Sequence, residues 1–231
     1  MSVSLSVVVP CFNAAAYLDA ALRSVALQAV PDVEVIVIDD GSTDGSAEIA
    51  RRHSPSVRLV QQEHQGISAS RNRGIELSRG EIVGFLDADD LLPPESLRSR
   101  LDVLASFPEA DGATGLVKQF ISPELNPKER VGLEVSDAPS CGRVAGAMLL
   151  RRAVFKRVGG FDSRFRLGET LDWVSRADAA GVSMRSVDEV VLLRRIHAAN
   201  SVRRATQLRS DYLRVLKASI DRQRRRSGSD A

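Results

Sequence analysis

Cysteine, aromatic residues and long apolar runs are all scarce in this chain. Its two cysteines, Cys11 and Cys141, lie far apart and match neither a disulfide framework nor a metal-site spacing. Reduced, buried thiols in a cytosolic protein are therefore expected. Only 4% of the residues are aromatic, so the core has to be built mainly from Val, Leu, Ile and Ala. No apolar run approaches the length that a membrane-spanning helix needs.

The composition nonetheless allows a substantial hydrophobic core. Hydrophobic residues make up 43% of the 231 positions, which excludes an intrinsically disordered chain. The first ten residues, MSVSLSVVVP, lack the basic start and the small-residue cleavage site of a signal peptide. We therefore expect a soluble, cytoplasmic protein.

Charge is distributed unevenly along the chain. The formal net charge is +2, but residues 203–226 contain nine Arg or Lys and two Asp, so the rest of the chain is acidic. A basic tail behind an acidic body favours an anionic partner for the tail, either a membrane surface or nucleic acid.

Short apolar runs alternate with helical patterns over the first hundred residues. The runs are continuously apolar and rich in Val, Ile and Leu, as in strands that are covered on both faces. Because helical segments and short loops separate them, the pattern predicts a mainly parallel sheet with helices on both faces. The expected strands are residues 4–10, 33–38, 57–62 and 81–86, and the expected helices are residues 14–28, 46–53, 67–80 and 94–107.

Polar side chains follow three of these expected strands. The segment PCFN contains Asn13, DDGSTD contains Asp40, and DADD contains both Asp87 and Asp89. In open parallel sheets, ligands bind beyond the carboxyl ends of the strands. Helix capping explains a single acidic turn, whereas three such turns at one edge predict a ligand site.

The same segments indicate the kind of ligand. No G-x-G-x-x-G or G-x-x-x-x-G-K-[ST] motif follows any of these strands, which argues against a dinucleotide site and a P-loop. Asp87 and Asp89 instead supply hard oxygen ligands, which suit Mg²⁺ or Mn²⁺. Such ions keep part of their coordination shell for phosphate oxygens, so a diphosphate-bearing substrate is expected. Arg71, near the start of a helix, is a candidate for a phosphate contact or for the base pocket, and a solvated helix arginine is the alternative.

Four segments together resemble the family 2 glycosyltransferases of the GT-A fold. They are VVVPCFNAAAYLDAALRSVALQ, VIDDGSTDGS, ISASRNRGI and FLDADD, whose order and spacing match over residues 5 to about 105. The resemblance implies an α/β fold of the GT-A type, with a mostly parallel, Rossmann-like sheet flanked by helices. It also implies an inverting enzyme that moves a sugar from a nucleotide-diphosphate donor to an acceptor hydroxyl with Mn²⁺ or Mg²⁺. A UDP-sugar is the expected donor.

The resemblance assigns donor-site roles to individual positions. Phe12 is expected to stack on the base, and Asp40 is expected to accept a hydrogen bond from it. Asp87 and Asp89 form the D-x-D pair of the family, with Asp89 as the expected direct metal ligand. The nucleotide-sugar-binding positions carried over in this way are Pro10, Phe12, Asn13, Asp40, Arg71 and Asp87.

The second half of the chain is expected to bind the acceptor. Residues 142–162 resemble the segment of the family in which a small-residue strand leads to a helix below the acceptor. Gly146 suits a close approach of the backbone to a sugar, and tight packing is the alternative explanation.

Residues 166–181 resemble the acidic catalytic motif of the family. Inverting transfer needs a general base for the acceptor hydroxyl. Family members usually present an adjacent Glu-Asp pair, whereas here Glu169 is followed by Thr170 and the next acid is Asp172. Helical spacing puts both acids on one face, and we favour Asp172 as the base and Glu169 as the residue that orients the acceptor. Trp173 is expected to hold the sugar ring, and a role of Glu169 in offsetting the helix dipole is the alternative.

Two residues near the end of this half complete the expected site. His197 is one of three histidines, and the resemblance implies that it completes the metal shell. Arg195, which follows Arg194, is expected to meet the diphosphate and neutralise the departing nucleotide. An ordinary surface histidine is the alternative for His197.

We expect one catalytic domain over residues 1–202, with a nucleotide-sugar half at 1–106 and an acceptor half at 107–202. A basic amphipathic helix and a disordered tail are expected over residues 203–231. The helix either docks on the catalytic domain or binds the inner face of an anionic membrane. A homodimer is also left open.

Three other functions remain as alternatives. A sugar nucleotidyltransferase shares a parallel sheet and an acidic metal site, but PCFNAAA lacks the Gly-rich, basic loop of that class. A catalytically weak or dead relative that binds a sugar nucleotide as a scaffold is kept open by the broken Glu-Asp pair. Nucleic-acid binding rests on the basic tail alone and is not expected, because no aromatic platform accompanies it.

Overall fold

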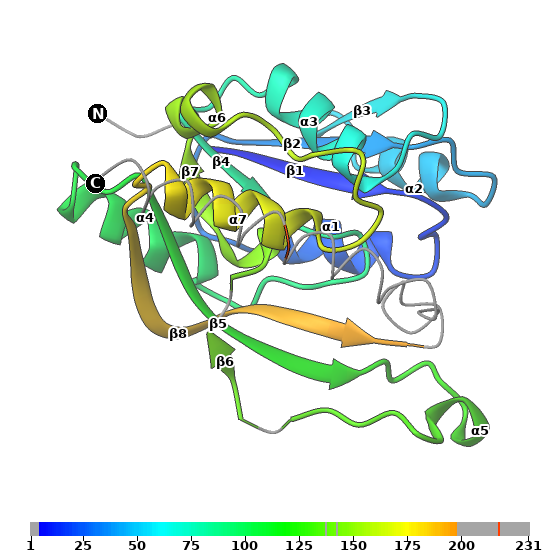
Figure 1. Ribbon diagram of the computed structural model, residues 1–231. Coiled ribbons are helices and arrows are strands. Elements are labelled where there is room, and N and C mark those ends of the chain that lie inside the picture. The colour runs from blue at the N-terminus through cyan, green and yellow to red at the C-terminus, as the bar shows by residue number, and fades with distance from the viewer. Residues whose placement is uncertain (1–4, 137, 142, 198–216, 218–231) are drawn as a thin grey trace.

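A twisted sheet between two layers of helices forms the body of the protein (Figure 1). The computed structural model describes residues 5–136, 138–141, 143–197 and 217. The predicted carboxy-terminal helix and tail therefore lie outside the described residues, apart from one position. Within the described ranges, no helix has the length and apolar character required to cross a bilayer.

The amino-terminal half of the sheet is parallel. β1 (Leu5–Cys11) lies between β2 (Val33–Asp39) and β4 (Ile82–Phe85), and β3 (Val57–Gln61) pairs with the outer edge of β2. Every pair here is parallel because a helix returns the chain between consecutive strands. The four strands predicted from the apolar runs are confirmed.

The carboxy-terminal half adds antiparallel strands to β4. β7 (Leu149–Arg151) runs antiparallel to β4, and β5 (Gly112–Ile121) runs antiparallel to β7. β6 (Ser140–Cys141) then pairs with β5, giving the order β3-β2-β1-β4-β7-β5-β6. β8 (Met184–Ile196) pairs along the length of β5 in parallel, and the two strands extend together toward one end of the molecule (Figure 1).

The sheet separates two apolar clusters. Alternate residues of β1 point to opposite faces, so Val7 and Val9 join one cluster while Val8 joins the other. The first cluster is covered by α1, α2 and α4, and the second by α3, α6 and α7. These helices are α1 (Leu18–Ala26), α2 (Ser46–Arg52), α3 (Ile67–Leu77), α4 (Ser96–Ser106), α6 (Ala153–Val158) and α7 (Glu169–Ala179).

Two short elements lie in the connections of the second half. α5 (Pro127–Arg130) stands at the far end of the long β5–β6 connection (Figure 1), and Asn126 caps it by accepting hydrogen bonds from the amides of Lys128 and Glu129. A 3₁₀ turn, η1 (Ala145–Ala147), precedes β7 and underlies the site.

Helix α3 approaches β1 unusually closely, and Gly74 is the reason. A Cβ atom at this position would lie 2.1 Å from Cγ1 of Val8, so only glycine fits without movement of the strand or the helix. Arg71 lies one turn earlier on the same buried face of α3. The close approach therefore sets how far the Arg71 side chain stands from the strand ends.

We expect Gly74→Ala to lower the free energy of unfolding by about 1–3 kcal/mol through overpacking, despite the better helix propensity of alanine. Gly45→Ala is the matched control, because a Cβ there meets no atom within 4 Å and φ is −30°. It should cost less than about 1 kcal/mol, because Gly45 is the N-cap of α2 and glycine is preferred to alanine at that position. Urea titrations compare the two, and equal stabilities would contradict the close packing of α3 on β1.

Candidate functional site

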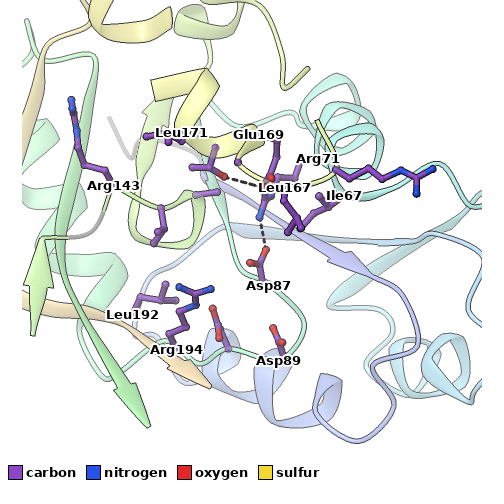
Figure 2. Close-up of a pocket in the computed structure, with 16 residues that line it drawn as sticks. Ile67, Arg71, Asp87, Asp89, Arg143, Leu167, Glu169, Leu171, Leu192 and Arg194 are labelled. Carbon is purple, nitrogen blue, oxygen red and sulfur yellow. Dashed lines mark hydrogen bonds and ion pairs between the residues drawn. The ribbon is translucent and has the colours of Figure 1, made fainter. Parts of the chain in front are cut away.

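A cavity of about 290 Å³ opens beside the turn that follows β4 (Figure 2), whereas Phe12, Asn13, Asp40 and His197 lie outside its lining. Its walls come from the start of α3, the turn after β4, η1, the start of α7 and the end of β8. The charged lining is Arg71, Asp87, Asp89, Asp90, Arg143, Arg166, Glu169 and Arg194. The apolar lining is Ile67, Val144, Ala145, Leu167, Leu171 and Leu192.

Arg71 joins the two halves of the chain at the centre of this cavity. Its Nη2 donates to Oδ1 of Asp87 at 2.7 Å, and its Nη1 donates to Oε1 of Glu169 at 2.7 Å (Figure 2). The side chain is almost fully buried. Burial alone would lower the pKa of Arg71, but the charges of Asp87 and Glu169 outweigh it and raise that pKa.

Two further contacts hold the same guanidinium. Its carbon lies 5.3 Å from the centre of the Phe161 ring, a cation–π distance. Thr170 Oγ1 accepts from Nη1 at 3.3 Å and donates to Oε1 of Glu169 at 3.1 Å. Arg71, Glu169 and Thr170 therefore form one hydrogen-bonded group at the start of α7.

The D-x-D turn after β4 is held by the end of β8. The backbones of Leu91 and Leu193 exchange two hydrogen bonds, at 3.0 and 2.9 Å. This bridge brings His197 beside the turn, where its Nε2 lies 3.0 Å from Oδ2 of Asp89. Two residues predicted as metal ligands, Asp89 and His197, therefore lie next to each other.

Asp90 is the third carboxylate of the turn, and its environment differs from that of the other two. It is buried and accepts a hydrogen bond from the Arg195 amide at 2.9 Å. Burial raises its pKa well above the usual range, and the neighbouring charges of Asp89 and Asp87 raise it further. Burial and the two neighbouring charges therefore disfavour the ionised form of Asp90.

The residues present fit a hard divalent cation in part. Asp89 contributes carboxylate oxygens, and His197 presents a ring nitrogen next to them. Across the part of the chain that the structure describes, no group of three or more His, Cys, Asp or Glu side chains forms a complete metal cage. An ion held by two side chains keeps positions for phosphate oxygens, which matches the chemistry of a diphosphate ligand.

The expected base-binding end lies beyond β1 and β2. Phe12 is exposed there, and Asp40 lies next to it with a buried carboxylate. His64 contacts both residues. Asn13 has a positive φ of 50° and accepts a hydrogen bond from the Thr43 amide, so it closes the turn after β2 onto the turn after β1. Pro10 is buried within β1 and lies behind this surface.

The structure does not bring Asp172 or Trp173 to the cavity. The Asp172 carboxylate is 3% exposed and pairs with Nε of Arg176 at 2.8 Å, one turn along α7. Trp173 packs in the second apolar cluster, and its Nε1 donates to the Gly159 carbonyl. The predicted placement failed because α7 contributes only its first three residues, Glu169 to Leu171, to the cavity lining, and the Asp172 side chain turns to Arg176 instead.

Two other predicted contacts are also displaced. Arg195 is buried between the rings of Tyr17 and Phe120 and donates to the Asp89 carbonyl, whereas Arg194 lines the cavity. Neighbouring residues of a strand point to opposite sides, which explains why Arg194 and not Arg195 reaches the cavity. Gly146 lies behind the wall, where a Cβ would stand 3.0 Å from Leu192, so tight packing explains this glycine.

Sequence reasoning also missed residues that line the cavity. Leu171 is 42% exposed and Thr170 is half-buried, both at the first turn of α7. The sequence did mark Thr170 as a possible site residue, because it stands where the second acid of the Glu-Asp pair is expected. No sequence pattern marked Arg166 or Leu171, since single residues of these types occur on most protein surfaces.

Comparisons with known proteins agree with this geometry. The sequence model described as Glycosyl transferase family 2 matches residues 6–159. The chain therefore belongs to glycosyltransferase family 2, as the sequence motifs predicted.

Several curated glycosyltransferases are similar in sequence. Glycosyltransferase AglE of Haloferax volcanii is 32% identical over 199 residues, which cover 81% of this chain and 65% of that protein. The cholesterol galactosyltransferase of Borreliella burgdorferi is 36% identical over 151 residues, covering 63% and 41%. The chain thus spans less than two thirds of the length of these relatives.

Solved structures share the fold. The mannosyltransferase PcManGT from Pyrobaculum calidifontis, in complex with GDP-Man and Mn²⁺, superposes with a TM-score of 0.71 at 22% identity, covering 94% of this chain and 65% of that chain. TarS 1–349 of S. aureus in complex with UDP-GlcNAc gives a TM-score of 0.70 at 22% identity, covering 87% and 61%. The predicted GT-A fold is confirmed.

Replacing Arg71 tests the central ion pairs. We expect Arg71→Met to cost about 2–4 kcal/mol of unfolding free energy, because Asp87 and Glu169 lose their partner. We expect a loss near the lower end of this range, because the Asp87 side chain is 35% exposed and solvent screens its interaction with Arg71. Denaturant unfolding measures the loss. Arg73→Met on the exposed face of α3, where Arg73 pairs only with Glu76, should change stability by less than about 0.5 kcal/mol.

Proposed function

We propose that this protein transfers a sugar from a nucleotide-diphosphate donor to an acceptor hydroxyl, with inversion and with a divalent cation. The observation that carries the proposal is the convergence of the D-x-D turn, Arg71 and Glu169 on one cavity in a family 2 chain. Similar structures in complex with GDP-Man and UDP-GlcNAc support a nucleotide-sugar ligand.

The donor lies along the strand ends in this proposal. Its base sits against Phe12 and Asp40, and a UDP-sugar remains the expected donor. The diphosphate reaches the D-x-D turn, where Arg194 lines the cavity and supplies positive charge. Positive charge at the leaving group stabilises the transition state of transfer.

Asp89 and His197 are the residues that would hold the cation. When bound there, Mn²⁺ or Mg²⁺ would neutralise the charge that builds on the departing diphosphate. Asp87 is engaged by Arg71 at 2.7 Å, so it orients the arginine beside the donor and faces the same cavity.

Glu169 is the better candidate for the base, because it is the acid of α7 that lines the cavity. Arg71 and Thr170 both bond Oε1, and no described residue donates to Oε2. In the proposed step Oε2 takes the proton of the acceptor hydroxyl while the acceptor oxygen bonds the anomeric carbon. The bond from that carbon to the diphosphate oxygen breaks on the opposite side, which inverts the centre.

A weak or inactive sugar-nucleotide-binding relative is the second candidate. Thr170 favours it, since a hydroxyl replaces the second acid that family members usually have. The bond from Arg71 to Glu169 points the same way, because an arginine competes with the acceptor proton for that carboxylate. The two candidates share the donor site and differ in the chemical step.

Removing the metal ligand tests the donor proposal. UDP or GDP should bind the wild-type protein more tightly with Mn²⁺ than with chelator in calorimetry. In Asp89→Asn this metal dependence should fall by about tenfold or more, because one charged ligand is lost. Asp102→Asn on the exposed face of α4 is the control and should behave as wild type. Equal affinity of the wild-type protein with and without metal would refute metal dependence.

The roles of Glu169 and Asp172 are tested by measuring how fast variants at these positions hydrolyse UDP-GlcNAc and GDP-Man. Glu169→Gln should lower the rate by about 10²–10⁴ without weakening nucleotide binding. Asp172→Asn should keep the rate, once any loss of stability is allowed for, because Asp172 is paired with Arg176 away from the cavity.

Thr170→Asp separates the two candidate functions. It restores an adjacent acid pair at the first turn of a helix, where the dipole tolerates negative charge. A large gain in hydrolysis over wild type supports the weak relative, whereas an unchanged or lower rate supports Glu169 as a sufficient base.

A further inference from the structure

His64 makes an unusual pair of contacts at the expected base end of the site. Its ring stacks on Phe12, with ring centroids 4.1 Å apart and planes inclined by 29°. Its Nδ1 lies 2.9 Å from Oδ2 of Asp40 and 3.2 Å from the Asp40 carbonyl oxygen. Because a carboxylate and a carbonyl only accept, Nδ1 carries the hydrogen and donates it.

The surroundings of this imidazole indicate what kind of ligand could take its place. Phe12 follows β1 and is 47% exposed, and His64 covers one face of its ring. The Asp40 side chain is 3% exposed at the end of β2, so its oxygens need donors. An aromatic face beside a buried acceptor suits a flat heterocycle with a ring N–H. The imidazole of His64 is such a heterocycle.

The other donors to Asp40 are harder to replace than His64. Gln62 Nε2 and the Gln65 amide donate to Oδ1 at 2.7 and 2.9 Å, and the Gly66 amide donates to Oδ2 at 2.7 Å. Two of these donors are backbone groups, so moving them requires the whole loop before α3 to move. The His64 side chain is 56% exposed and leaves by rotating into solvent.

We propose that His64 is a placeholder for the nucleobase of the donor. This inference rests on the proposed function and extends it. In the free protein the imidazole occupies the ring position on Phe12 and the place of a ring N–H on Oδ2 of Asp40. The incoming base displaces it from both contacts, while the Gln65 and Gly66 amides keep Asp40 in place.

The placeholder has consequences for affinity and for selectivity. Each donor that binds must first break the contacts of His64, so the histidine lowers nucleotide affinity. A base that takes over the bond to Asp40 has to donate a hydrogen. Uracil and guanine donate from a ring N–H, whereas cytosine and adenine donate from an exocyclic amino group, which projects further from the ring than the N–H of an imidazole.

Calorimetry of UDP binding with Mn²⁺ tests the affinity effect. His64→Ala should bind UDP about two- to tenfold more tightly than wild type, the range expected for one net hydrogen bond. His53→Ala is the matched control, because His53 also pairs with an aspartate, Asp19, but follows the carboxyl end of α2 and does not line the cavity. Its affinity should equal that of wild type. Unchanged or weaker binding by His64→Ala would overturn the proposal.

Nuclear Overhauser contacts between the His64 and Phe12 rings provide a second measurement on the unmodified protein. They should be present in the free protein and disappear at saturating UDP. Contacts that persist in the complex would make His64 a wall of the base site and refute the displacement. If the wild-type protein binds neither UDP nor GDP, the donor proposal fails as well. If the wild-type protein binds UDP and His64→Ala binds it more weakly, only the placeholder role of His64 is rejected.

Discussion

The buried guanidinium of Arg71 is the interaction on which the site depends. It takes one carboxylate from the turn after β4 and another from the first turn of α7, at 2.7 Å each. Burying a charge costs several kcal/mol, and two close carboxylates with good geometry offset that cost. Because Asp87 belongs to the parallel half and Glu169 to the second half, the same contacts join both halves at the cavity. Gly74 allows this arrangement by letting α3 lie against β1.

The crowding of three carboxylates in one turn is relieved in three different ways. Asp87 pairs with Arg71, and Asp89 lies against the ring nitrogen of His197. Asp90 is buried, and burial and the neighbouring charges raise its pKa, which disfavours its ionised form. Because the buried Arg71 already holds Asp87, Asp89 is the carboxylate that would exchange its histidine contact for the proposed cation.

Much of the fold could be predicted from local patterns, whereas the site could be predicted only in part. Buried parallel strands have a continuous apolar signature, and their carboxyl ends meet at one edge, so Asp40, Asp87 and Asp89 could be placed at that edge. Asp172 was misplaced because helical spacing identifies a shared face but not how far along that face a cavity extends. Which of Arg194 and Arg195 faces the cavity depends on the register of β8 with β5, and this register cannot be read from the sequence. No spacing rule connects His64 to Phe12, since that contact is made by tertiary packing.

Thr170 keeps a further negative charge out of the cavity at the position where the second acid is expected. A second acid at this position would stand beside Glu169 and near Asp87, with Arg71 already bonded to both. The threonine hydroxyl instead donates to the Glu169 oxygen that Arg71 also bonds, so it reinforces the group without adding charge. Glu169 therefore has a structural reason to be present whether or not it accepts a proton. The hydrogen bonds around Arg71 consequently do not require the complete acid pair, so nucleotide binding and sugar transfer are separable parts of the proposed function.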